Sequence, residues 1–274
     1  MISFPDCKIN LGLNVTGKRP DGFHDLESVF LHVPLNDVLE IIEDPAPEKG
    51  RDWSFECSGL PVPADASQNL VVRAYLLLKA KFALPAVKIY LHKVIPMGAG
   101  LGGGSSDAAF MLKLLMQKFN LAIGEAELTG FAATLGSDCP FFLQSETAYV
   151  TGRGEKIELF QLNLSGYHLA IVNPRIHIAT ATAFNLIKPQ QRKESLRKVL
   201  SEPVDNWKDR LVNDFEIPVM EIYPEIKSIK EKLFNMGAAY VSMTGTGSSV
   251  YGIFDGDVDL TLFDKQYFVW KGPL

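Results

Sequence analysis

Hydrophobic and polar residues alternate from Val87 to His92, with Val87, Ile89 and Leu91 as the apolar members. This two-residue period is typical of a strand with one buried face. Short apolar runs between turn residues predict further β-structure at 8–15, 26–33 and 38–42, and the charged, proline-containing segment 44–52 is typical of a surface loop. The N-terminal part of the chain is therefore predicted to be rich in strands.

Other segments carry the helical period, in which apolar residues recur three and four positions apart. In the segment 69–82 these residues include Leu70, Ala74 and Leu78, and Pro85 follows. The same period predicts helices at 108–119, 125–135, 182–187, 193–200, 207–215 and 224–236, with strand and turn structure over 148–172 and strands at 239–243 and 250–254. Because strands and helices follow one another without a steady alternation, we expect an α+β fold.

The chain has 274 residues, enough for two modest domains, and a boundary near 163–175 predicts domains at 1–163 and 164–274. Its formal net charge of −5 lacks the basic surplus that binding to nucleic acid or to an anionic membrane requires. Three widely spaced cysteines, the lack of a long apolar run and a start unlike a secretory leader favour a reduced, cytoplasmic protein. We expect neither nucleic acid nor membrane as a partner, and both a monomer and a homodimer remain open.

The strongest chemical signal is a glycine-rich run between a predicted strand and a predicted helix. The run consists of Pro96, Met97, Gly98, Ala99, Gly100, Leu101, Gly102, Gly103, Gly104, Ser105 and Ser106. Glycines leave backbone N–H groups unshielded, and the N-terminal end of the next helix attracts anions, so the run is predicted to bind phosphate. The alternative is a tightly turned connector whose serines serve only as helix caps.

The run does not fit the common nucleotide-binding patterns in its context. It contains GxGxxG, but the second strand with an acidic end about 20 positions later, which a dinucleotide fold requires, is missing. No Walker-type Gly-Lys-Ser or Gly-Lys-Thr follows it. The histidines and cysteines lack HExxH and zinc-ligand spacing, and the chain has no GxSxG. The run therefore predicts a phosphate loop of another kind.

Together with two distant segments, the run resembles the signature motifs of the GHMP kinases, which phosphorylate small molecules. The other segments are Lys8-Ile-Asn10-Leu near the start and Thr244-Gly-Thr-Gly-Ser248 near the end. Within these kinases, the segments 16–26, 68–70, 101–106 and 135–142 resemble the 4-diphosphocytidyl-2-C-methyl-D-erythritol kinase family. The resemblance implies an N-terminal domain similar to a ribosomal-protein fold and a ferredoxin-like C-terminal domain. The latter departs from the family at its end, where a short, aspartate-rich segment (255–265) stands in place of a helix.

The resemblance further implies an ATP-dependent kinase, with Mg²⁺ brought by ATP and its protein ligands undefined. Lys8 and Asp138 match the catalytic pair of the family, in which the carboxylate takes the proton of the acceptor hydroxyl and the lysine steadies the developing charge. Without the resemblance, Asp138 is more simply a helix-capping residue and Lys8 a solvated charge on a strand.

Further residues are assigned to the two substrates by the same resemblance. Asn69 and the glycine run are expected to contact the nucleotide. The acceptor, a small molecule linked to cytidine diphosphate, is expected to contact Asn10, Phe23, His24, Thr180, Phe184, Thr244, Gly245, Thr246 and Gly247. Phe23 and Phe184 are expected to stack on the cytosine while His24 bonds its edge, although core packing and a turn are the plainer roles. A kinase for another acceptor and a non-catalytic nucleotide sensor remain the alternatives.

Overall fold

The computed structural model describes residues 1–190, 192 and 194–274, and these form two compact units. Unit 1 comprises Met1–Cys7, Pro34–Met97 and Gly102–Ser145. Unit 2 comprises Lys8–Val33, Gly98–Leu101 and Glu146–Leu274. The units are therefore interleaved along the chain, and the linear division into 1–163 and 164–274 stays a prediction.

Unit 1 contains a four-stranded sheet whose strand order is β1-β4-β6-β5. Its strands are β1 (Ile2–Ser3), β4 (Val38–Glu43), β5 (Trp53–Gly59) and β6 (Val87–Lys93). β5 runs parallel to β6, and the other neighbouring pairs are antiparallel. Every second residue of β6 is buried, from Val87 to Lys93, which confirms the strand that the alternation predicts.

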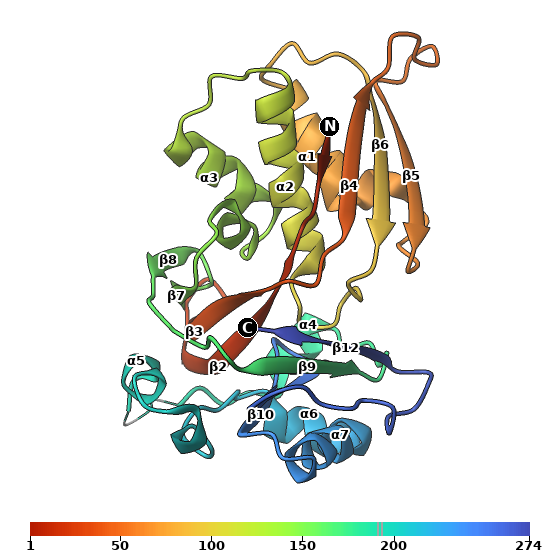
Figure 1. Cartoon of the computed structure of the whole chain (residues 1–274). Helices are drawn as coiled ribbons and strands as arrows, with labels where there is room; N and C mark the ends of the chain where they lie inside the picture. The colour runs from red at the N-terminus through yellow and green to blue at the C-terminus, as the bar shows by residue number, and fades with distance from the viewer. Residues whose placement is uncertain (191, 193) are drawn as a thin grey trace. The chain divides into compact units, whose positions relative to one another are not determined.

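The helices of unit 1 pack against this sheet and enclose its core. They are α1 (Leu70–Lys79), α2 (Gly103–Lys118) and α3 (Glu125–Leu135), with short 3₁₀ helices η1 (Ala66–Gln68) and η2 (Cys139–Leu143). Leu39 and Ile89 of the sheet share one buried cluster with Val72, Leu112 and Phe131 of the helices. Figure 1 shows α1 crossing behind β4 and β6. The predicted helices at 69–82, 108–119 and 125–135 are confirmed.

Unit 2 contains two further four-stranded sheets. The first has the order β2-β3-β7-β8 and consists of β2 (Cys7–Lys18), β3 (His24–Val33), β7 (Ala148–Gly152) and β8 (Lys156–Leu159). The second has the order β10-β11-β9-β12 and consists of β9 (His168–Asn173), β10 (Tyr240–Met243), β11 (Val250–Phe254) and β12 (Phe268–Pro273). All pairs of the second sheet are antiparallel. The end of the chain thus adds an edge strand, which the sequence pattern did not predict.

The helices of unit 2 are α4 (Thr180–Asn185), α5 (Leu196–Leu200), η3 (Val204–Asn206), α6 (Glu216–Ile222) and α7 (Pro224–Asn235). Figure 1 shows α6 and α7 on one face of the sheet that contains β9 and β10. Val219 of α6 and Leu233 of α7 are buried there with Val172 and Val241 of the strands. This arrangement follows from the apolar stripes that these helices turn inward.

Two predicted helices differ in the structure. The helix expected at 207–215 is wrong, because this backbone pairs with another segment: the N–H of Leu13 donates to the carbonyl of Val212, and the N–H of Asp214 donates to that of Leu13. Asp209 is left-handed, with φ of +61°, and interrupts any helical path. The helix expected at 193–200 begins at Leu196, after a cap in which Ser195 accepts the N–H of Lys198, and Lys193 lies outside the described residues.

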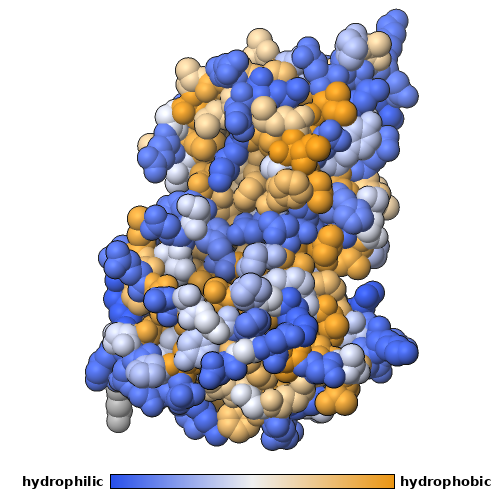
Figure 2. Space-filling view, in the orientation of Figure 1, coloured by the Kyte–Doolittle hydropathy of each residue, from blue (hydrophilic) through white to orange (hydrophobic). Residues whose placement is uncertain are grey.

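The surface is largely polar on the face drawn in Figure 2, with apolar residues scattered among hydrophilic ones. Across the residues that the structure describes, no helix has the length and apolar character needed to cross a membrane. Cys7, Cys57 and Cys139 are all free thiols, in agreement with the reduced cysteines that their odd number and wide spacing favour.

Candidate active site

The second half of the glycine run begins α2 in unit 1. Gly102 precedes the helix in the left-handed conformation, with φ of +70°, and brings no side chain to bond the amides of the first turn. First-turn N–H groups have no partner within their own helix, so those of Gly103, Gly104 and Ser105 face outward from its positive end. This geometry is that of a phosphate-binding helix terminus.

Close packing fixes the backbone at Gly103. A Cβ atom there would stand 2.8 Å from Cγ2 of Ile95 and 3.3 Å from Nζ of Lys93. At Gly104 the nearest neighbour of a Cβ atom would be Leu70, at an ordinary 3.9 Å. The two adjacent glycines therefore differ: the first is required by its surroundings, and the second is not.

The first turn of α2 lies next to a buried trio of charges, which consists of Lys93, Asp37 and Asp107. Nζ of Lys93 donates to Asp37 and, at 2.8 Å, to Oδ2 of Asp107. Oδ1 of Asp107 is buried without a hydrogen-bond partner. Burial and the nearby charge of Asp37 outweigh the attraction of Lys93 and raise the pKa of Asp107 to about 7.

The trio joins the end of β6 to the first turns of α2. Oδ1 of Asp37 accepts the N–H groups of Val94 and Ile95 at 2.6 and 2.9 Å, while Lys93 reaches Asp107 on the helix. Sequence reasoning missed this trio. A signal was present, because Lys93 continues the buried series of Val87, Ile89 and Leu91 on the same strand face.

The stretch Gly98–Leu101 of the glycine run belongs to unit 2 and lies against the turn that begins at Thr244. Oγ1 of Thr244 donates to the carbonyl of Gly100 at 3.0 Å, and the N–H of Ser249 donates to that of Ala99 at 3.2 Å. Gly100 has φ of +79°, and a Cβ atom there would stand only 2.0 Å from the carbonyl oxygen of Thr244. Both glycine-rich segments therefore need their glycines in order to approach each other.

Asn10 connects this turn to Lys8. Its Oδ1 accepts hydrogen bonds from Nζ of Lys8 at 2.6 Å and from the N–H of Gly245 at 2.9 Å, and it lies 3.1 Å from Oγ1 of Thr244. Its Nδ2 donates to Oγ of Ser28 at 2.9 Å. The side chain of Asn10 thus bonds Lys8, Ser28 and Gly245 inside unit 2, and it orients the lysine and the turn together.

Lys8 is almost fully buried, with 3% of its surface exposed, so it is not the solvated strand charge that was the alternative. Its backbone N–H donates to the carbonyl of Leu101 at 3.0 Å, and its Nζ lies 4.4 Å from the centre of the Phe30 ring. A buried ammonium held by an amide oxygen and an aromatic face is a fixed positive charge beside the glycine run.

Asp138 directly precedes η2 in unit 1, and its side chain forms no capping hydrogen bond with that helix. The plainer role of a capping residue is therefore not what the geometry shows. The neighbouring Cys139 is buried, and burial raises the pKa of its thiol to about 12, so this thiol stays protonated and unreactive. Asp138 itself is half-buried and lies at the surface of the unit.

The aromatic residues expected around cytosine lie in unit 2. The rings of His24 and Phe184 stack with centroids 5.0 Å apart and planes inclined by 25°, and the edge of Phe215 meets Phe184 at 4.9 Å. Phe23 is 53% exposed, and the guanidinium of Arg153 lies 4.9 Å from the centre of its ring. His24 and Phe215 thus both contact Phe184, while Phe23 is exposed and has Arg153 over its ring.

The predicted site residues fall into two groups, one in each unit. Lys8 and all residues expected to contact the acceptor lie in unit 2: Asn10, Phe23, His24, Thr180, Phe184, Thr244, Gly245, Thr246 and Gly247. Asp138, Asn69 and most of the glycine run lie in unit 1. Asn69 caps α1 by accepting the N–H of Val71 at 2.9 Å. Thr180 is exposed at the start of α4.

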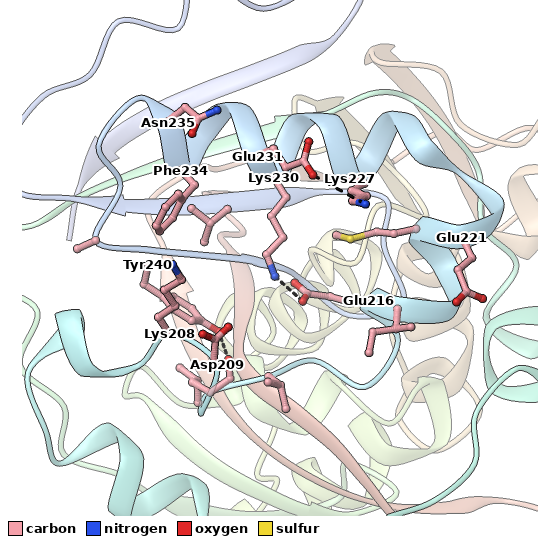
Figure 3. A pocket seen from close by; sticks show the side chains of 16 residues that line it. Lys208, Asp209, Glu216, Glu221, Lys227, Lys230, Glu231, Phe234, Asn235 and Tyr240 are labelled. Carbon is pink, nitrogen blue, oxygen red and sulfur yellow. Dashed lines mark hydrogen bonds and ion pairs between the residues drawn. The ribbon is translucent and has the colours of Figure 1, made fainter.

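A cavity of about 810 Å³ lies elsewhere in unit 2, between the α6 and α7 helices and β10, and none of the predicted residues lines it. Figure 3 shows the ion pair of Lys230 and Glu216 in its wall, with Nζ and Oε2 2.6 Å apart. Oε1 of Glu216 accepts the N–H of Met243 at 2.7 Å, the residue before the Thr244 turn. Asn213 also supports this turn, since its Nδ2 donates to the carbonyls of Met243 and Gly245 at 2.7 and 2.9 Å.

Among the described residues, no three His, Cys, Asp or Glu side chains are grouped so that they could hold a metal ion. The buried Oγ of Ser106, in the first turn of α2, has no hydrogen-bond partner. A phosphate oxygen at the helix terminus fits this unused hydroxyl.

Two family models match the chain, GHMP kinases N terminal domain over residues 69–146 and GHMP kinases C terminal over residues 186–261. A crystal structure of Methanococcus jannaschii mevalonate kinase has the same fold, with a TM-score of 0.65 at 14% identity over 93% of this chain and 90% of its own. The fold and the two matched domains are those of a GHMP kinase.

More similar proteins define the family within this class. The 4-diphosphocytidyl-2-C-methyl-D-erythritol kinase of Bacteroides fragilis is 48% identical over 267 residues, which cover 97% of this chain and 96% of the relative. A crystal structure of 4-(cytidine 5'-diphospho)-2C-methyl-D-erythritol kinase matches with a TM-score of 0.79 and 30% identity over 93% of this chain and 91% of its own. The chain belongs to the 4-diphosphocytidyl-2-C-methyl-D-erythritol kinase family, which confirms the resemblance of its motifs.

Proposed function

We propose that this protein transfers the γ-phosphate of ATP to the 2-hydroxyl of 4-diphosphocytidyl-2-C-methyl-D-erythritol, giving the 2-phosphate and ADP. This reaction is a step of the non-mevalonate route to isoprenoid precursors. The observation that carries the proposal is the 48% identity with a kinase of this name over nearly the whole chain. The retained Lys8 and Asp138 support a catalytic rather than a sensory role, because a sensor needs phosphate binding but no proton acceptor.

In the transfer, the acceptor hydroxyl oxygen forms a bond to the γ-phosphorus while the bond to the ADP oxygen breaks. The hydroxyl proton passes to the carboxylate of Asp138. The buried ammonium of Lys8, whose Nζ lies 2.6 Å from Oδ1 of Asn10, offsets the negative charge that develops on the transferred group. Mg²⁺ comes with ATP and neutralises charge on the phosphates.

The nucleotide phosphates are held by the amides of Gly103, Gly104 and Ser105 at the start of α2, with Asn69 near the nucleoside. The cytidine of the acceptor is held by Phe23, His24, Thr180 and Phe184. The His24–Phe184 stack supports this assignment, because it offers a flat face and a ring nitrogen side by side. Asn10 and the turn from Thr244 to Gly247 shape the acceptor side through the hydrogen bonds that hold Lys8.

We also place the protein in the cytoplasm, where its three free cysteines stay reduced. Its partner is the cytidine-diphosphate-linked acceptor, and it works as a monomer or a homodimer.

A coupled assay of ADP release tests the proposal against a kinase for another acceptor. Purified protein is given ATP, Mg²⁺ and, in separate reactions, 4-diphosphocytidyl-2-C-methyl-D-erythritol, mevalonate, homoserine or galactose. ADP release with the cytidine compound alone is the expected result. Turnover of another acceptor at an equal or greater rate would contradict the proposal.

A further inference from the structure

His177 lies against the start of the glycine run in unit 2. A Cβ atom at Gly98 would stand 3.1 Å from Nδ1 of His177 and 3.4 Å from its Cε1, so the missing side chain of Gly98 leaves the room that the imidazole occupies. The histidine as a whole is exposed. An imidazole therefore stands beside the loop without being buried by it.

The backbone on both sides of His177 is anchored. Nδ2 of Asn173 donates to Oγ of Ser248 and of Ser249 at 3.1 and 3.0 Å, while its Oδ1 accepts the N–H of Arg175 at 2.8 Å. Oγ of Ser248 donates to the carbonyl of Ile176 at 2.6 Å. The side chain on the other flank, Ile178, is buried in the core of the unit. His177 is thus an exposed residue on a fixed stretch of backbone, which is how binding side chains are commonly presented.

The segment that carries His177 lies between Gly98 of the glycine run, which is expected to contact the nucleotide, and α4, which carries residues expected to contact the acceptor. On one side is the glycine run, in which the carbonyl of Leu101 accepts the N–H of Lys8 at 3.0 Å. On the other side is α4, which begins at Thr180 and carries Phe184, the ring stacked on His24. An acceptor whose cytosine lies at Phe184 and whose reacting hydroxyl lies near Lys8 has its diphosphate between these two points.

We propose that His177 binds the diphosphate of the acceptor, and so selects acceptors that carry one; this inference rests on the proposed function. An imidazole suits the role because it donates N–H groups to phosphate oxygens, and both nitrogens donate when it is protonated. Because His177 lies beside Gly98, it meets the acceptor at the diphosphate, between the cytosine and the reacting hydroxyl. His177 acts on binding of the acceptor, whereas proton transfer is the task of Asp138.

Binding of cytidine and of CDP separates this role from a purely structural one, because the two ligands share the base and differ by the diphosphate. Titration calorimetry measures both ligands against the parent and the His177→Ala variant. Loss of a charge-assisted contact weakens CDP binding by about 10-fold to 100-fold. Cytidine binding is expected to change by less than about twofold. His177→Gln, which keeps an N–H donor, is expected to retain part of the CDP affinity.

Kinetics give a second readout. The KM of the acceptor is expected to rise in His177→Ala while the KM of ATP stays at the parent value. The matched control is His92→Ala. His92 is an exposed histidine of unit 1 that bonds Oγ of Ser58 at 2.9 Å, and its replacement is expected to change neither the KM of the acceptor nor that of ATP. Equal CDP affinity in the parent and His177→Ala, or an equal loss for CDP and cytidine, would overturn the inference. A parent that binds neither ligand and does not use the cytidine acceptor would instead overturn the proposed function.

Discussion

Asn10 and Thr244, which are 234 residues apart in the chain, are joined by a buried hydrogen bond. The backbone N–H of Asn10 donates to Oγ1 of Thr244, and this oxygen, whose own proton goes to the carbonyl of Gly100, lies 3.1 Å from Oδ1 of Asn10. Since Oδ1 of Asn10 also holds Nζ of Lys8 at 2.6 Å, one buried amide aligns the lysine with the C-terminal turn. The position of Lys8 therefore depends on residues from both ends of the sequence.

Thr244→Val tests this link. Valine keeps the shape of threonine but leaves the buried N–H of Asn10 without its acceptor, so the free energy of unfolding should fall by about 1–3 kcal/mol. Urea unfolding measures the loss, and turnover should fall with it because Lys8 loses its alignment. Thr246→Val, two positions along the same turn, is the matched control and should change stability by less than about 0.5 kcal/mol. An equal loss of unfolding free energy in Thr244→Val and Thr246→Val would contradict the link.

Asp138→Asn tests the proton acceptor. The amide keeps the size of the carboxylate but cannot take the hydroxyl proton, so kcat should fall by about two to four decades while the KM values change little. Steady-state kinetics of ADP release provides the measurement. Combining Asp138→Asn with Lys8→Ala should cost less than the sum of the single losses, because the two groups act as a unit. A variant that turns over like the parent would remove Asp138 from the mechanism.

Gly103→Val tests the phosphate loop. The branched side chain would meet Ile95, which a Cβ atom alone already approaches to 2.8 Å, and it would distort the amides that bind phosphate. The dissociation constant of ATP, measured by calorimetry, should rise by more than about tenfold. Gly104→Ala is the control, since its Cβ atom meets only Leu70 at 3.9 Å and the site is helical. An unchanged ATP affinity in Gly103→Val would reduce the run to a connector.

His24→Ala tests the cytosine pocket. Removing the ring that stacks on Phe184 should weaken the cytidine acceptor strongly and leave the KM of ATP nearly unchanged. A uridine analogue of the acceptor presents a different hydrogen-bonding edge, so it should slow the parent far more than the variant. Competition between the two acceptors measures the preference. Equal use of both bases by the parent would contradict the pocket.

Asp107→Asn tests the buried trio through the pH dependence of stability. Burial raises the pKa of Asp107 to about 7 in the folded protein, above the 3.8 of a free aspartate, so the folded state binds more protons than the unfolded state between these values. The carboxylate therefore lowers the stability of the parent progressively as pH rises through this window. Asparagine resembles the protonated form, so the Tm of the variant relative to the parent should rise from pH 4 to pH 8. A constant difference would contradict the raised pKa.

The sequence predicts those parts of the molecule in which the local pattern and the tertiary environment agree. The alternation at Val87, Ile89 and Leu91 predicts β6, and the apolar period from Leu70 predicts α1, because each element buries one face. Segment 207–215 has apolar residues at helical spacing, yet it is not a helix, since Leu13 from β2 takes its backbone hydrogen bonds. β12 was missed for a related reason: its alternate residues are only partly buried, and its pairing with β9 is a long-range contact.

The same distinction applies to the candidate site, where some residues can be recognised in the sequence and others cannot. The glycine run is visible in sequence because glycine is required where backbones approach closely, as at Gly100. Residues that support the site through buried polar contacts have no comparable local signal: Ser28, Asn213 and Glu216 bond partners that only the fold brings near. Lys93 is the exception, since a charged residue in a buried strand series points to a buried partner.

Phosphorus NMR of the complete reaction tests the central claim most directly. The protein, ATP, Mg²⁺ and 4-diphosphocytidyl-2-C-methyl-D-erythritol are incubated to completion, with Asp138→Asn as a parallel sample. The account predicts one ADP for each new phosphomonoester, located on the 2-hydroxyl of the acceptor, and almost none in the variant over the same time. A phosphate on another hydroxyl, release of inorganic phosphate in its place, or an equal yield from the variant would contradict it.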